Sequence, residues 1–85
     1  MGKKKVADQI QVDGTVTRLP STVARMEFTR VQDIVGGYVE HANGVRHTEL
    51  WCNEDGIARG LPFNPKASEM TGFRVLGDAI VEHWE

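Results

Sequence analysis

The side chains best suited to chemistry in this chain fall within one stretch, from Phe28 to Asn64. Aromatic rings supply contact area, and carboxylates and imidazoles orient a ligand through charge and hydrogen bonds. Such side chains alternate along a predicted β-hairpin, in which every second residue points to the same side. We therefore predict one candidate binding face, made of Tyr38, Glu40, His47, Glu49 and Trp51. An ordinary solvated sheet face with cross-strand pairs explains the same residues without a ligand.

The make-up of this face depends on the turn at Asn43-Gly44. Asn-Gly is the strongest short hairpin signal, because both central residues of a type I′ turn need a positive φ. The turn would join strands over residues 37–42 and 45–53 and set Glu40 opposite His47. A shift of one residue would exchange the two faces. The second face, which we expect to pack on a helix, carries Val39, Thr48, Leu50 and Cys52.

Catalytic and metal chemistry is weakly represented. Glu40 and Glu49 would form a catalytic carboxylate pair only if they shared a concave surface. Cys52 has no histidine on its own face, so a small buried side chain is a better interpretation than a nucleophile. Metal binding needs three or four convergent ligands, and no typical spacing links the histidines and the cysteine. We predict a protein that is not an enzyme and has no metal or cofactor; the residues considered are His41, His47, His83 and Cys52.

The loop from Asn53 to Asn64 is a second candidate site. Asn and Asp usually cap backbone groups at turns, which is a sufficient structural role. Gly60 would permit close approach of a ligand, and the first amides of a helix after Asn64 would receive an anion. The alternative function is therefore binding or sequestration of a small ligand, such as a nucleotide, by Asn53 and Asn64.

Length and charge limit the classes of partner. A chain of 85 residues allows one domain, which we assign to residues 8–85 after a flexible basic N-terminus at 1–7. Ten Lys and Arg against 12 Asp and Glu argue against a nucleic-acid partner. We expect no membrane segment, because no apolar run approaches about 20 residues. A single cysteine fits a reducing cytoplasm, and a core this small allows a homo-oligomer.

Turn and cap signals divide the chain into a hairpin, a helix and a second hairpin. Residues 9–19 form a hairpin around Asp13-Gly14, in which Val12 pairs either with Thr15 or, with a bulge at Gly14, with Val16. A helix starts at Arg30, with Thr29 and Gln32 as a capping box, and ends at Gly36.

The second half of the chain reads as a short return strand, a helix and a final strand. The return strand covers residues 57–61. Asn64 caps a helix over 66–70 that ends at Gly72. The final strand covers 73–84, with a bend at Gly77-Asp78. The predicted fold class is α+β: a small antiparallel sheet of two hairpins plus a C-terminal strand, with two short helices.

Five segments stand out in chain order: VDGTV (12–16), FTRVQDIVGGYVE (28–40), CNEDG (52–56), GLPFN (60–64) and LGDAIV (76–81). Together they resemble a family of small proteins of unknown function, found mainly in bacteriophages, plasmids and other viral genomes. The resemblance covers nearly the whole chain and implies a mobile-element accessory protein that binds a host protein or sequesters a small molecule. The lead-in Arg25-Met26 and Trp51 depart from the pattern. The positions it singles out are Gly14, Gly36, Gly37, Tyr38, Glu40, Asn53, Gly56, Leu61, Asn64, Gly77 and Asp78.

Overall fold

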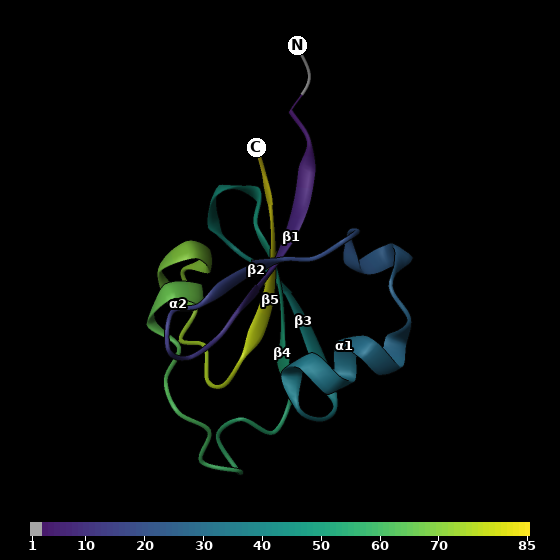
Figure 1. Cartoon of the computed structure of the whole chain (residues 1–85). Helices are drawn as coiled ribbons and strands as arrows, with labels where there is room; N and C mark the ends of the chain where they lie inside the picture. Colours follow the sequence, from purple (N-terminus) through teal and green to yellow (C-terminus); the bar gives the residue numbers. More distant parts are fainter. Residues whose placement is uncertain (1–2) are drawn as a thin grey trace.

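A computed structural model describes residues 3–85 as three layers, with one sheet between two helices (Figure 1). The five strands pair only in antiparallel fashion, in the order β2-β1-β5-β4-β3. The predicted α+β class is therefore confirmed. The elements are β1 (Lys5–Ile10), β2 (Val16–Arg18), η1 (Val23–Arg25), α1 (Phe28–Val35), β3 (Val39–Asn43), η2 (Val45–His47), β4 (Glu49–Asn53), α2 (Pro65–Thr71) and β5 (Ala79–Trp84).

The two helices cover opposite faces of the sheet, so the first three residues of the middle strand β5, Ala79 to Val81, are apolar on both sides. On the α1 side, Ala7, Val31 and Ile80 pack together with Leu19, and Trp51 lies at the margin of this cluster. On the α2 side the buried cluster consists of Ile10, Leu50, Ala67, Val75, Ala79 and Val81. Burial on both faces explains why the sequence of β5 shows no simple alternation.

The chain enters the sheet earlier than predicted. β1 begins at Lys5, so residues 5–7 belong to a strand and not to the N-terminal tail; residues 1–2 of that tail lie outside the described residues. Ile10 pairs with Val16, which is neither of the two registers considered. The intervening loop is closed by a hydrogen bond from Gln11 N to Thr15 O at 2.9 Å and by Gly14 at a φ of 92°.

The start of α1 differs from the prediction, whereas its end agrees with it. The helix begins at Phe28 with Glu27 as N-cap, and Arg30 N already donates to Glu27 O at 3.0 Å. Thr29 is thus inside the first turn and the predicted capping box is wrong. Gly36 closes the helix in the left-handed conformation, as predicted, with a φ of 82°.

In the second half of the chain the predicted helix is confirmed, whereas the predicted return strand does not form. Asn64 caps α2 with Pro65 in the first turn, and Gly72 ends it at a φ of 81°. Residues 57–60 form turns and Leu61 has no regular structure, so the return strand predicted over 57–61 does not form. The final strand starts at Ala79, after the turn at Gly77, so its predicted first part, residues 73–78, is not part of β5.

The register of the central hairpin is also corrected. Glu40 pairs with Cys52 and His41 pairs with Trp51, a shift of five residues from the predicted pairing of Glu40 with His47. Gly44 has an extended backbone, with a φ of −96° and a ψ of −175°, and the turn is longer than two residues. A shift by an odd number exchanges the two faces of a strand.

Gly44 is required by packing and not by a positive φ. A Cβ at this position would lie 2.7 Å from the carbonyl oxygen of Thr71, at the end of α2, and would also overlap the Thr48 hydroxyl. Thr48 Oγ1 in turn donates to Val45 O at 2.7 Å and closes the loop. Within this loop the residues with a positive φ are Arg46 and His47.

We predict that Asn64→Ala lowers the free energy of unfolding by about 3 kcal/mol or more. The Asn64 side chain is fully buried; its Nδ2 donates to Ile10 O and Gly77 O at 2.9 Å, and its Oδ1 accepts from Ala67 N at 3.1 Å. Alanine would leave these groups buried without partners. Urea denaturation measures the loss; Lys66→Ala, an exposed change in the same helix, should cost less than about 0.5 kcal/mol. Equal stability of the two variants would contradict this role of Asn64.

Candidate functional site

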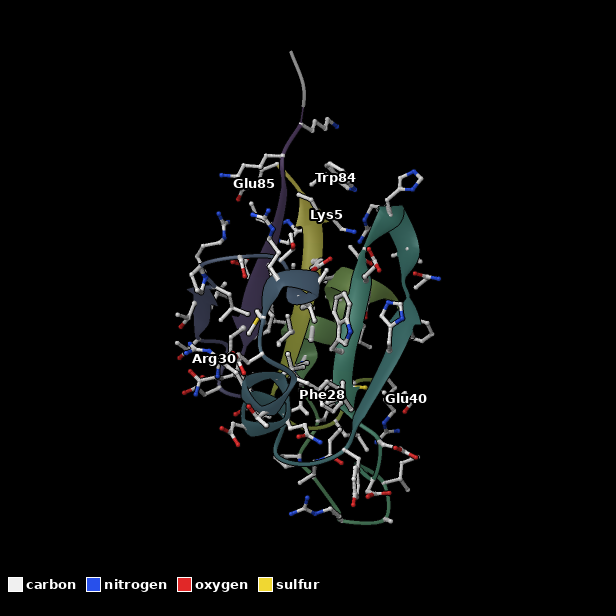
Figure 2. The ribbon with its side chains drawn as sticks, turned by 90° about the vertical axis from the view of Figure 1, so that its right-hand side faces the viewer. Lys5, Phe28, Arg30, Glu40, Trp84 and Glu85 are labelled. Carbon is white, nitrogen blue, oxygen red and sulfur yellow. The ribbon has the colours of Figure 1, made fainter. Side chains whose placement is uncertain are left out.

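The α1 side of the sheet is only partly covered by helix. Figure 2 views the molecule from this side: the coils of η1 and α1 lie in front of β1 and β5, while much of β4 and β3 is left uncovered. Residues of β4 and β3 that point to this side include Trp51 and His41, which pair across the two strands. An aromatic surface is therefore open beside α1.

His41 and Trp51 form a stacked pair at the centre of this surface. Their ring centroids are 4.6 Å apart, and the planes differ by 29°. His41 Nε2 also lies 3.1 Å from Glu49 Oε1, and the His41 side chain is 44% exposed. The stack and the hydrogen bond hold both rings in place; His41 is exposed, whereas Trp51 is partly exposed and packs against the α1-side cluster. We call His41, Glu49, Trp51 and Lys5 the Trp51 patch.

Lys5 connects two carboxylates at the upper end of the patch. Glu49 and Glu82 are directly opposite each other on β4 and β5. Lys5 Nζ donates a short hydrogen bond to Glu49 Oε2 and lies 3.3 Å from Glu82 Oε1. Glu82 is 3% exposed, and its other oxygen accepts from Val23 N at 2.6 Å. A buried carboxylate needs such partners, because its desolvation is otherwise uncompensated.

The electrostatics of the patch follow from this bridge. The hydrogen bond to Glu49 raises the pKa of Lys5 above its ordinary 10.5, outweighing burial, which acts in the opposite direction. The same hydrogen bond lowers the pKa of Glu49 below its ordinary 4.5. Lys5 also lies 5.9 Å from the centre of the Trp84 ring. Figure 2 shows these two labelled residues together at the end of the sheet where both termini emerge.

A second ionic cluster lies on the α2 side of the sheet. Asp8 is 5% exposed and accepts from Arg18 Nε at 2.6 Å, while His83 Nε2 lies 2.6 Å from its other oxygen. Burial alone would raise the pKa of Asp8, but hydrogen bonds with Arg18 and His83 outweigh it and the pKa is lowered. Arg18 also bonds Glu85 at 2.5 Å. This cluster fastens β2 and the C-terminal residue to β1.

The structure divides the predicted binding face. Trp51 and Glu49 share the α1 side, but Glu40 pairs with Cys52 on the α2 side. Tyr38 precedes β3, and His47 lies in the η2 loop with a φ of 61°. The predicted pair of Glu40 with His47 does not form. Because Glu40 and Glu49 are on opposite faces, they cannot act as a catalytic carboxylate pair.

Cys52 packs against the α2-side core and not against α1. It joins the cluster that includes Leu50, whereas both residues were predicted to pack on the helix that starts at Arg30. Burial, and secondarily the charge of Glu40, raises the pKa of the thiol. A raised thiol pKa fits the interpretation of Cys52 as a packing residue.

Asn53 and Asn64 use their amides inside the fold. Asn53 is 4% exposed; its Nδ2 donates to Val35 O at 3.1 Å and its Oδ1 accepts from Asp55 N at 2.8 Å. It therefore joins the end of α1 to the turn after β4. The Asn64 amide likewise satisfies three backbone groups, among them the amide of Ala67 in the first turn of α2. Neither side chain points a free polar group at a ligand.

A groove of about 640 Å³ lies at the C-terminal end of α1. Tyr38 is 69% exposed at its rim, and Arg59 Nη1 donates to Gly36 O at 2.8 Å. The guanidinium is thereby held in place with further donors available. The groove is lined by Gln32, Asp33, Gly36, Gly37, Tyr38, Asp55 and Arg59.

Two residues of the Trp51 patch, Lys5 and His41, were not predicted from the sequence as members of the binding face. The alternation of Val6, Asp8 and Ile10 on one side and Ala7 on the other is compatible with a strand, so Lys5 could have been assigned to β1. His41 was left out of the predicted binding face because the two-residue turn was assumed. The local sequence contains no comparable signal for the longer loop.

In residues 3–85 there is no group of three or more His, Cys, Asp or Glu side chains that could hold a metal ion. Within the same range, every helix is too short or too polar to cross a membrane.

The fold and patch define a small α+β domain with two helices on a five-stranded antiparallel sheet. Residues 9–83 match the model of a domain of unknown function, DUF3846. The chain belongs to this family, which agrees with the resemblance to an uncharacterised family. No curated protein and no solved structure shows a significant match to the chain.

We predict that Glu49→Gln lowers the free energy of unfolding by about 1 kcal/mol at neutral pH. The folded-state pKa of Glu49 is lowered, so its ion pair with Lys5 stabilises the fold above pH 4.5. This contribution is lost as the pH falls below 4.5 through the lowered pKa.

Denaturant titrations at neutral and acidic pH measure the effect. The difference between Glu49→Gln and the parent protein should shrink on acidification. Glu54→Gln, a change at an exposed acid in the turn after β4, is the matched control and should have no effect on stability at either pH. A Glu49→Gln difference that is the same at both pH values would contradict the ion-pair explanation.

Proposed function

We propose that the protein is a non-enzymatic binding protein that engages a partner protein through the Trp51 patch. The observation that carries this proposal is the stacked pair His41 and Trp51, which is held in place on a sheet surface that α1 leaves uncovered. Tryptophan is enriched among the residues that dominate binding energy at protein interfaces.

The patch is preorganised for binding. Glu49 fixes the His41 ring from one side, and Lys5 fixes Glu49 from the other. Side chains that are already ordered lose less conformational entropy when a partner binds. The charges at the rim are paired within the protein, so a partner would contact the rings without leaving an unpaired buried charge.

The resemblance to phage and plasmid proteins supports a host protein as the partner. An accessory protein of a mobile element would act in the cytoplasm of the host cell, where a protein surface of this kind can meet its target. The uncovered strands form a surface between α1 and the sheet edge, a shape that suits a protein better than a small molecule.

We predict that the double variant His41→Ala with Trp51→Ala loses the partner. The tagged protein is used to capture proteins from a lysate of its natural host, and each captured protein is purified and titrated against the variants. Binding should weaken by about tenfold or more, because both rings at the centre of the patch are removed. Ile57→Ser is the matched control, since Ile57 is 87% exposed in a loop away from β3 and β4. Partners that bind the double variant as tightly as the parent protein would overturn the proposal.

The groove beside Tyr38 supports a second candidate function, the binding of a small ligand such as a nucleotide. An exposed aromatic ring offers a stacking surface, and Arg59 offers charged donors that suit a phosphate or carboxylate. The site borders the loop from Asn53 to Asn64 through Asp55 and Arg59. It differs from the site expected from sequence, because the amides of Asn53 and Asn64 are engaged in the fold.

We predict for this candidate that a nucleotide raises the melting temperature and that Tyr38→Ala removes the shift. A ligand at 100 times its dissociation constant adds about 2.7 kcal/mol to the stability of the folded state. A thermal-shift series over nucleoside mono-, di- and triphosphates measures this, with Phe73→Ala as an exposed aromatic control outside the groove. An unchanged melting temperature with every nucleotide, or an equal shift for Tyr38→Ala, would contradict the candidate.

A further inference from the structure

The two edges of the sheet are unequal. β2 is a three-residue strand that is followed by Pro20, and a short strand next to a proline offers little to a neighbouring strand. β3 is a five-residue edge strand with the sequence VEHAN, which has neither the lysine nor the proline that commonly protects a sheet edge. Of the two sheet edges in residues 3–85, only β3 can therefore extend the sheet.

The backbone of β3 fixes which groups face outward. Glu54 N donates to Tyr38 O at one end of β3, and Gly44 N donates to Thr48 O at the other end, both at 2.8 Å. In a strand the N–H and C=O of one residue point to the same side, and successive residues alternate. Tyr38, Glu40, Ala42 and Gly44 thus face β4. The backbone groups of Val39, His41 and Asn43 point away from the sheet, where the described chain has no further strand.

We propose that β3 pairs with β3 of a second copy of this chain, so that two five-stranded sheets join in one closed dimer. An antiparallel pairing about a two-fold axis at His41 sets Val39 opposite Asn43 of the second copy, and His41 opposite itself. This register uses every outward-facing backbone group of the strand. A register displaced along the strand in either direction would leave some of them unpaired.

The side chains favour a second copy in this register. Glu40 falls opposite Ala42 of the other chain, so the two glutamates never face each other; like charges directly opposite destabilise a strand pair. One step beyond the strand, Tyr38 falls opposite Gly44, which has no side chain to obstruct the ring. Tyr38 and Val45 are 69% and 46% exposed, and both flank the joined edge.

The inequality of the edges also determines the size of the assembly. A β3 edge that paired with β2 of another copy would leave free edges and grow into a filament, whereas β3 with β3 uses the same surface on both chains and closes. β2 is too short to compete. The proposal concerns the backbone edge of β3 and does not depend on the function proposed for the Trp51 patch.

Asn43→Pro tests the dimer through the backbone. The Asn43 N–H points away from β4, so proline removes an outward donor and leaves the pairing of β3 with β4 in place. Light scattering coupled to size exclusion, over a series of protein concentrations, should give twice the chain mass for the parent protein and for Asn43→Ala. Asn43→Pro should weaken the dimer by about tenfold or more, while its circular dichroism spectrum stays that of the folded chain.

A charge pair tests the register independently of proline. Ala42→Glu places a glutamate opposite Glu40 of the second copy and should weaken the dimer several-fold; Ala42→Lys places a lysine there and should preserve or tighten it. A parent protein that stays monomeric at all concentrations, or grows beyond a dimer, would overturn the proposal. A dimer that is unaffected by Asn43→Pro, or that responds equally to Ala42→Glu and Ala42→Lys, would also overturn it.

Discussion

The close contact between Gly44 and the end of α2 sets the geometry of the β3–β4 half of the molecule. The loop after β3 reaches the Thr71 carbonyl so closely that a Cβ at Gly44 would stand 2.7 Å from its oxygen. The loop therefore runs against α2 before β4 begins, and the pairing of β3 with β4 is displaced by five residues from that of a tight turn. Because five is odd, this packing contact decides which side chains face α1.

Trp51 reaches the α1 side together with His41 for this reason, and Glu40 is sent to the α2 side. The Trp51 patch is thus a consequence of this packing constraint. A two-residue turn would have given a different surface with the same amino acids.

Local signals in the sequence predicted those elements whose causes are local. Asn64 with Pro65, and Gly36 and Gly72 at the helix ends, specify caps through backbone geometry that a few neighbouring residues determine. The α+β class followed from such signals. The capping box at Thr29 failed because Glu27, two residues earlier, supplies the carbonyl that starts the helix.

The candidate site could be predicted only in part, because it depends on contacts between distant residues. Trp51 and Glu49 were named correctly as members of one face, but their true neighbours are His41 on β3 and Lys5 on β1. Lys5 and Glu49 are 44 positions apart, and no local pattern brings them together. Asn53 and Asn64 were also singled out, and the structure gives both a role in the fold.

Buried carboxylates on opposite faces fasten the same end of the sheet. Glu82 is bonded by Lys5 and Val23 on the α1 side, and Asp8 by Arg18 and His83 on the α2 side. Each is costly to bury alone, so each holds its partners to the strands where the termini meet. Ion pairs of charged side chains thus help to close this end of the sheet.

The patch and the edge reinforce each other if two chains join through β3. The two-fold axis would pass beside His41, so the rings of both copies would lie next to each other on one continuous sheet surface. A surface doubled in this way presents two Trp51 patches to the same side, and a partner with two matching sites would gain from their effective concentration. The fold would then achieve, through one unprotected strand edge, a binding area that an 85-residue chain cannot present alone.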